Sequence, residues 1–177
     1  MPASAMMRSP AGAAGAAIVI AIVGAAAILG AFYFQYALGL QPCPLCLEQR
    51  IAYYFAIPLA LIVAFADSRG APRAPLTAAL VLIAFAMLVN AGLGVYHAGI
   101  EWKFWPGPAD CSGPVTSLGR ASDLMRQLRN VTIVRCDEAA WRFLGLSLAG
   151  YNVLISLALA AIAVWALVGY HALAGTA

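Results

Sequence analysis

The stretch Gln41-Pro42-Cys43-Pro44-Leu45-Cys46-Leu47-Glu48-Gln49-Arg50 stands between two strongly apolar runs, and it decides where the helices on either side begin and end. Pro44 suits the first position of a helix, because its missing N–H would be unpaired there anyway. That placement makes Cys43 the N-cap residue and puts Cys46 in the first turn. Thiolates are favoured at helix N-termini, and Arg50 follows Cys46 at i+4, on the same helix face. The pattern therefore predicts a thiolate-prone Cys46 beside a permanent cation.

The runs on either side predict membrane spans. Of the 177 residues, 64% are hydrophobic and 10% are charged, whereas soluble domains are about half apolar and about a quarter charged. The uncharged run over residues 11–40 exceeds the roughly 20 residues that cross a bilayer, so we expect a retained span and not a cleaved signal peptide. We place four spans at about residues 11–38, 47–66, 76–98 and 143–172 of a single domain, 1–177. The predicted fold class is an all-α membrane protein, a four-transmembrane-helix bundle.

Two loops, at about residues 39–46 and 99–142, carry the four cysteines. Four spans put both of these loops on one side and both termini on the other. Stable disulfides belong outside the cytosol, and the short linker with Arg69 and Arg73 favours the cytoplasmic side. We therefore expect cytoplasmic termini and outward-facing cysteine loops. Residues 115–130 of the long loop repeat apolar side chains at helical spacing, which predicts an amphipathic helix at the membrane interface or packed against protein.

The four cysteines allow three interpretations: a redox relay, two structural disulfides or a zinc site. A CxxC disulfide closes so small a ring that it constrains the unfolded chain little, whereas CxxC pairs are suited to passing electrons. Structural zinc sites usually have two close pairs of ligands, but Cys111 and Cys136 stand far apart, so we expect no metal. The relay is favoured, and a non-catalytic scaffold stapled by two disulfides is the alternative from another class.

A relay that makes disulfides needs an electron acceptor. The sequence has no dinucleotide motif and no haem-binding CxxCH, and Cys46 lies where a lipid-soluble quinone could reach it. His97 and Glu101 stand at i and i+4 near the outer end of the third span, and ionisable groups near the membrane are functional hypotheses by default. Arg50 and His97 could donate hydrogen bonds to the quinone oxygens and so stabilise the reduced form.

Three segments together resemble the DsbB family of bacterial inner-membrane disulfide bond formation proteins. They are CPLCLEQR after the first span, Tyr96-His97 at the end of the third, and Cys136-Asp137-Glu138-Ala139-Ala140-Trp141-Arg142-Phe143-Leu144-Gly145-Leu146 before the fourth. The resemblance covers nearly the whole chain. It implies a thiol:quinone oxidoreductase of the bacterial inner membrane, with periplasmic cysteine loops and either ubiquinone or menaquinone as cofactor. The implied partner is a DsbA-like periplasmic thioredoxin-fold protein, and no nucleic acid is involved.

The resemblance also implies residue roles. Cys111 matches the cysteine that the partner attacks, and Cys136 matches its loop partner, which passes electrons on to Cys43. Cys46 matches the cysteine that contacts the quinone as a thiolate. The implied catalytic residues are Cys43, Cys46, Cys111 and Cys136, and the implied quinone-binding residues are Arg50, His97 and Glu101. Glu101 departs from the family pattern, in which an uncharged polar residue is expected. A paralogue that serves a dedicated partner fits the same motifs.

Overall fold

A computed structural model describes residues 12–108 and 136–172 of the chain. The elements are α1 (Ala13–Phe32), the π-helical turn η1 (Tyr33–Ala37), α2 (Pro44–Ser68), α3 (Arg73–Glu101), strands β1 (Arg142–Phe143) and β2 (Leu146–Ser147), and α5 (Leu148–Ala172). Within these ranges, four helices are long and apolar enough to cross a bilayer. The predicted all-α membrane bundle is therefore confirmed. The predictions for Cys111 and for a helix over residues 115–130 fall outside the described residues.

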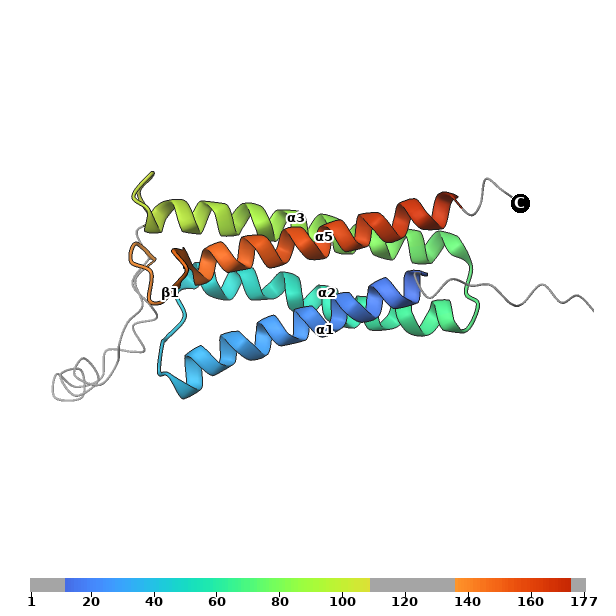
Figure 1. The fold of residues 1–177 in the computed structure, drawn as a ribbon, viewed down its shortest axis with the longest axis horizontal. Coiled ribbons are helices and arrows are strands. Elements are labelled where there is room, and N and C mark those ends of the chain that lie inside the picture. The colour runs from blue at the N-terminus through green and yellow to red at the C-terminus, as the bar shows by residue number, and fades with distance from the viewer. Residues whose placement is uncertain (1–11, 109–135, 173–177) are drawn as a thin grey trace, which may run out of the picture.

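The four long helices form a closed ring in the order α1, α2, α3, α5. Each packs against the next, and α5 packs back against α1. Figure 1 shows the helices running side by side along the long axis of the molecule. The start of α1, the α2–α3 connection and the end of α5 lie at one end of this bundle. The start of α2, the end of α3 and the β-hairpin lie at the other, so the ends that carry the predicted site residues come together.

Local chemistry fixes where α2 begins and how its far end is held. Pro44 occupies the first helical position, as predicted, and the Cys43 sulfur caps the helix by accepting the N–H of Cys46 at 3.3 Å. At the opposite end, the Asp67 carboxylate accepts the Ala14 N–H at 3.0 Å. This bond satisfies a free donor in the first turn of α1, and it ties α1 to the end of α2.

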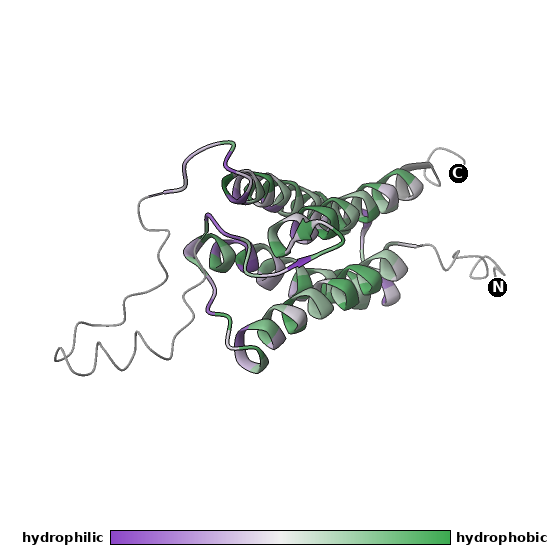
Figure 2. Cartoon of the chain, turned by 60° about the vertical axis from the view of Figure 1, so that its left-hand side comes forward, coloured by the Kyte–Doolittle hydropathy of each residue, from purple (hydrophilic) through white to green (hydrophobic). Residues whose placement is uncertain are grey.

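The bundle has an apolar interior and an equally apolar outer surface. The inner cluster includes Ile20, Val63, Ile83 and Leu159, each at most 1% exposed. Large apolar side chains also point outward from every long helix, including Ile22, Leu29, Ile62, Phe65, Phe85 and Trp165. Figure 2 shows that hydrophobic residues predominate along the helices in that view. Exposed apolar surface on this scale marks a membrane-facing protein, in agreement with the composition.

The fourth span begins later than predicted. Residues 142–147 form an antiparallel hairpin in which Arg142 pairs with Ser147 and Phe143 with Leu146. Its two turn residues, Leu144 and Gly145, both have positive φ, 49° and 83°, which is the backbone geometry that closes a two-residue hairpin. The apolar run from residue 143 therefore belongs first to the hairpin, and α5 begins at Leu148.

Candidate functional site

The cysteines of the described ranges meet at the N-terminal end of α2. Cys43 and Cys46 are thiols whose sulfur atoms lie 3.1 Å apart. Cys136, which precedes β1 in the chain, is brought against them, and its sulfur lies within 4.8 Å of both the Cys43 sulfur and a ring nitrogen of His97. Cys43 and Cys136 are fully buried. Residues from three distant parts of the sequence thus form one cluster.

Two kinds of contact hold Cys136 in this position. Leu45 and Ile100 pack around Cys43 and Cys136 as a small apolar cluster, separate from the main core. Beside it, the Lys103 ammonium donates to the backbone carbonyl of Asp137 at 2.6 Å and lies 3.1 Å from its carboxylate. An exposed ion pair contributes less than about 1 kcal/mol, so of these two contacts the apolar packing contributes more.

The environment of Cys43 favours its thiolate form. Its pKa is lowered, first because the Cys46 thiol donates a hydrogen bond to the Cys43 sulfur, and further because His97 and the Cys46 backbone N–H lie against it, while burial opposes the shift. The sequence pattern assigned this helix-terminus effect to Cys46. In the structure it acts on Cys43, because the N-cap side chain receives the free N–H groups of the first turn.

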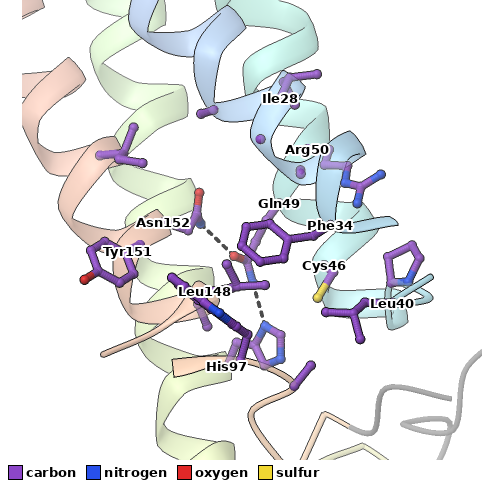
Figure 3. A pocket seen from close by; sticks show the side chains of 18 of the residues that line it. Ile28, Phe34, Leu40, Cys46, Gln49, Arg50, His97, Leu148, Tyr151 and Asn152 are labelled. Carbon is purple, nitrogen blue, oxygen red and sulfur yellow. Dashed lines mark hydrogen bonds between the residues drawn. The ribbon is translucent and has the colours of Figure 1, made fainter. Parts of the chain in front are cut away.

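A cavity of about 560 Å³ lies next to the cysteine cluster, within the usual size range of small-molecule sites, about 300–1,000 Å³. Figure 3 shows side chains from α1, α2, α3 and α5 around it. Its wall is mostly apolar, with several polar side chains among the residues that line it. Those polar side chains are Gln41, Gln49, Arg50, Tyr53, His97, Glu101, Tyr151 and Asn152.

Cys46 alone among the described cysteines lines this cavity. It is partly exposed, whereas Cys43 and Cys136 are fully buried behind it. Figure 3 shows the Cys46 sulfur among the cavity residues, beside Leu40. The two sulfurs of the CPLC segment therefore face different neighbours: Cys43 faces Cys136, and Cys46 faces the cavity.

Arg50 lines the cavity, but it does not make the predicted contact with the Cys46 sulfur. Its guanidinium donates to the Gln35 side-chain carbonyl at 2.7 Å and lies over the Phe32 ring, 5.5 Å from its centroid. Figure 3 shows the Arg50 guanidinium and the Cys46 sulfur pointing in different directions. A neutral thiol offers no charge to a guanidinium, whereas Gln35, on the π-helical turn, offers an oxygen acceptor.

His97 and Glu101 both line the cavity, next to the cysteines. The His97 Nε2 lies 3.7 Å from the Cys43 sulfur and 4.0 Å from the Glu101 Oε1. The Glu101 Oε2 is buried and has no hydrogen-bond partner among the residues that the structure describes. The structure thus brings together six of the seven sequence-predicted site residues, and the seventh, Cys111, lies outside the described ranges.

Sequence reasoning missed a polar network in the bundle interior. Gln49 contacts the His97 ring, and Asn152 and Tyr53 extend this contact into the bundle interior. Asn90 and Ser156 complete the network. Polar residues within long apolar runs are the signal that could have identified them, and Asn152 and Ser156 also share a helix face at i and i+4.

Aromatic side chains close the cavity on the hairpin side. Trp141 lies 5.1 Å from Phe34, 5.9 Å from Phe143 and 6.4 Å from Tyr151, measured between ring centroids. The Tyr151 hydroxyl also donates to the Phe143 carbonyl at 3.0 Å. The hairpin is therefore fastened to α5 and forms part of the cavity wall.

Two thiols and an imidazole are ligands that Zn²⁺ also accepts, so the convergence of Cys43, His97 and Cys136 does not by itself separate a metal site from a redox relay. Comparison with known proteins gives a separate observation. The profile of the family described as "Disulfide bond formation protein DsbB" matches residues 13–166.

Individual relatives agree with the family profile. A "Disulfide bond formation protein B" of Xanthomonas oryzae pv. oryzae (strain MAFF 311018) is 32% identical over 139 residues, which cover 77% of this chain and 78% of the relative. A protein of the same name from Polaromonas sp. (strain JS666 / ATCC BAA-500) is 32% identical over 152 residues, covering 80% and 84%. One from Marinobacter nauticus (strain ATCC 700491 / DSM 11845 / VT8) is 29% identical over 143 residues, covering 76% and 79%.

Proposed function

The chain belongs to the DsbB family of disulfide bond formation proteins, and from that premise we propose that it is a thiol:quinone oxidoreductase. It re-oxidises a DsbA-like periplasmic thioredoxin-fold protein and passes the electrons to ubiquinone or menaquinone. The proposal places the chain in the bacterial inner membrane, with cytoplasmic termini and periplasmic cysteine loops. The partner recognises the loop that carries Cys111.

The observation that carries this proposal is that the two CPLC sulfurs have different neighbours. Cys43 is buried against Cys136, within reach of thiol–disulfide exchange, and Cys46 faces the cavity. A structural disulfide has no need of such an arrangement. An electron relay needs it, because one sulfur must receive electrons from the loop cysteines and the other must pass them to the electron acceptor.

The exchange steps follow from thiolate chemistry. A partner thiolate attacks Cys111 of a Cys111–Cys136 disulfide, and Cys136 leaves as a thiolate. Cys136 then attacks Cys43 of a Cys43–Cys46 disulfide, so the Cys43–Cys136 bond forms and Cys46 leaves as a thiolate. The second partner thiolate attacks the partner sulfur of the mixed disulfide, which releases the partner as an internal disulfide and frees the Cys111 thiolate. Cys111 then attacks Cys136 of the Cys43–Cys136 bond, and Cys43 leaves as a thiolate. This restores the loop disulfide and leaves Cys43 and Cys46 reduced.

The CPLC dithiol then has to be oxidised. A quinone bound in the cavity supplies the acceptor for the two electrons and two protons that this dithiol gives up. Forming the Cys43–Cys46 bond requires both thiols to give up their protons, and the lowered pKa of Cys43 makes this easier for that thiol. His97, next to both the Cys43 sulfur and the cavity, is placed to take part in proton movement between them.

The donor set of the cavity fits a quinone. An apolar wall suits a hydrophobic ring and chain, and aromatic side chains such as Trp141 and Phe34 offer surfaces for stacking. Arg50 can donate to a carbonyl oxygen, and His97 lines the same cavity. The Glu101 Oε2, a buried oxygen with no partner among the described residues, can accept from a hydroxyl of the reduced form. Leaving such an oxygen unpaired costs about 1–3 kcal/mol, and a bound hydroxyl would remove that cost.

Purified protein in detergent, mixed with a reduced thioredoxin-fold dithiol protein and a soluble ubiquinone or menaquinone analogue, tests the proposal. We expect one quinol for each disulfide formed in the partner. The Cys46→Ser variant should abolish quinone reduction while Cys111 still traps the partner as a mixed disulfide. Quinone reduction by Cys46→Ser at the rate of the unmodified protein, or partner oxidation without quinone consumption, would contradict it.

A further inference from the structure

A series of directed hydrogen bonds runs from Tyr53, in the bundle interior, to the cysteine cluster. The Tyr53 hydroxyl donates to the Asn152 side-chain carbonyl at 2.7 Å. The Asn152 amide N–H donates to the Gln49 carbonyl at 2.6 Å, and the Gln49 amide lies 3.0 Å from the His97 Nδ1. The His97 Nε2 then faces the Cys43 sulfur at 3.7 Å. Figure 3 shows the Asn152–Gln49–His97 part of this series.

The direction of these hydrogen bonds determines which ring nitrogen of His97 carries the proton. An amide N–H₂ can only donate, so the Nδ1 that faces Gln49 must accept. A neutral imidazole then holds its proton on Nε2. That N–H faces the Cys43 sulfur at 3.7 Å, and the Glu101 Oε1 lies 4.0 Å from the same nitrogen.

The side-chain amides that take part in these hydrogen bonds cannot flip one at a time. Two donors, the Tyr53 hydroxyl and the Asn90 amide, converge on the carbonyl oxygen of Asn152 at 2.7 and 3.3 Å. If Asn152 alone turned over, its N–H₂ would face the Asn90 N–H₂, and its carbonyl would face the Gln49 carbonyl. Asn90 is 1% exposed, so no bulk water can repair such a mismatch. The orientation at Asn152 is therefore transmitted to Gln49 and to His97.

We propose that Asn152 is a positioning residue, which acts through Gln49 to hold His97 as the Nε2–H tautomer facing the Cys43 sulfur. The inference rests on the proposed function in one respect, because thiol–disulfide exchange at Cys43 is what makes a stabilised thiolate useful there. Neither Asn152 nor Gln49 touches a reacting sulfur in this arrangement. Their role is to ensure that the ring nitrogen beside Cys43 donates a hydrogen bond and does not compete for one.

Substitutions that remove the amide donors of Asn152 or Gln49 test whether these amides determine the His97 tautomer. Asn152→Asp has nearly the same shape but only acceptor oxygens when ionised. It forces the Gln49 amide to turn, so that the Gln49 carbonyl faces the His97 Nδ1 and requires a proton there. Gln49→Glu imposes the same requirement directly. Ser156→Ala is the matched control, because Ser156 bonds to Asn90 and Tyr53 but not to Gln49.

The measurement is ¹⁵N NMR of the histidine ring in reduced, quinone-free protein. The chain has two histidines, so replacing His171 leaves His97 as the only signal. We expect a protonated Nε2 and a bare Nδ1 in the unmodified protein and in Ser156→Ala, and a protonated Nδ1 in Asn152→Asp and Gln49→Glu. The thiolate absorbance of Cys43 should fall in the same two variants.

A bare Nδ1 in both acidic variants, or a protonated Nδ1 in the unmodified protein, would overturn the proposal. If Asn152→Asp does not fold, Gln49→Glu and the tautomer of the unmodified protein still decide it. The NMR readout requires neither quinone nor partner. A failure of the proposed oxidoreductase activity would therefore leave this result intact, and the reverse also holds.

Discussion

The His97 Nε2 lies 3.7 Å from the Cys43 sulfur, although the two residues are 54 positions apart in the sequence. Cys43 caps the start of α2 and His97 lies near the end of α3, so they meet because these helices pack antiparallel. The contact joins the buried cysteine pair to the cavity, since His97 touches both. It makes Cys43 the sulfur on which negative charge is best stabilised.

Removing the imidazole should raise the pKa of Cys43. In the His97→Ala variant, the Cys43 thiol loses one of the groups that lower its pKa, so its thiolate forms only at higher pH. The expected result is a smaller thiolate absorbance at about pH 7, where an ordinary cysteine is mostly protonated. An ultraviolet pH titration of the reduced protein, with Cys43→Ser as the blank, measures this. A titration identical to that of the unmodified protein would show that His97 does not act on Cys43.

Arg50 should matter for quinone binding and not for thiol exchange. Its guanidinium is held at the cavity by Gln35, and hydrogen bonds to charged groups contribute about 1.5–3 kcal/mol. We therefore expect Arg50→Ala to raise the KM for quinone about tenfold or more, since about 1.4 kcal/mol is a factor of ten. Gln35→Ala should raise it less. Steady-state kinetics with Arg69→Ala as the control, at the opposite end of α2, provide the check; equal KM values for Arg50→Ala and Arg69→Ala would remove Arg50 from the site.

The close approach of α3 and α5 depends on Gly94. A Cβ added there would lie 2.8 Å from the Val153 Cγ2 and 3.3 Å from the Asn152 side-chain nitrogen. We expect Gly94→Ala to destabilise the protein by about 1–3 kcal/mol, as overpacking does. Gly92→Ala, two positions earlier, meets nothing within 4 Å and should be neutral or stabilising by up to about 1 kcal/mol. Thermal unfolding in detergent compares the two, and equal stability would show that the helices do not approach this closely.

The proposed orientation predicts which residues a membrane-impermeant thiol reagent can reach. Leu144, at the hairpin tip, is 84% exposed, and Ser68 lies at the opposite end of α2. In a cysteine-free background, Leu144→Cys should be labelled in intact cells from the periplasmic side. Ser68→Cys should be labelled only after the inner membrane is permeabilised. The reverse pattern would place the cysteine loops in the cytoplasm.

Sequence reasoning could predict the helices, because long apolar runs have few alternatives in a membrane protein, and it could predict the start of α2 from Pro44 and Cys43. It could not predict the hairpin before α5. The residues that form it, such as Phe143 and Leu146, are as apolar as the helix that follows, and only the positive φ of Leu144 and Gly145 separates the two.

The candidate site likewise has residues that the sequence could predict and contacts that it could not. Cys43, Cys46 and His97 were identifiable from their motifs, because sulfur and imidazole are rare in membrane spans and carry chemistry there. The partner of Arg50 was not, since helical spacing places residues on one face but does not decide what a long side chain reaches. Asn152 was missed for a related reason: an isolated polar residue in an apolar run does not reveal which neighbours it pairs with.

The central claim is that electrons leave the protein through the cavity that Cys46 lines. A photoreactive quinone analogue, cross-linked to the purified protein and mapped by peptide mass spectrometry, tests this most directly. The account predicts adducts in the peptides that carry Cys46, Arg50 and Trp141, and predicts that excess ubiquinone or menaquinone prevents them. Adducts confined to the outward-facing surfaces of the helices, unaffected by competing quinone, would contradict it.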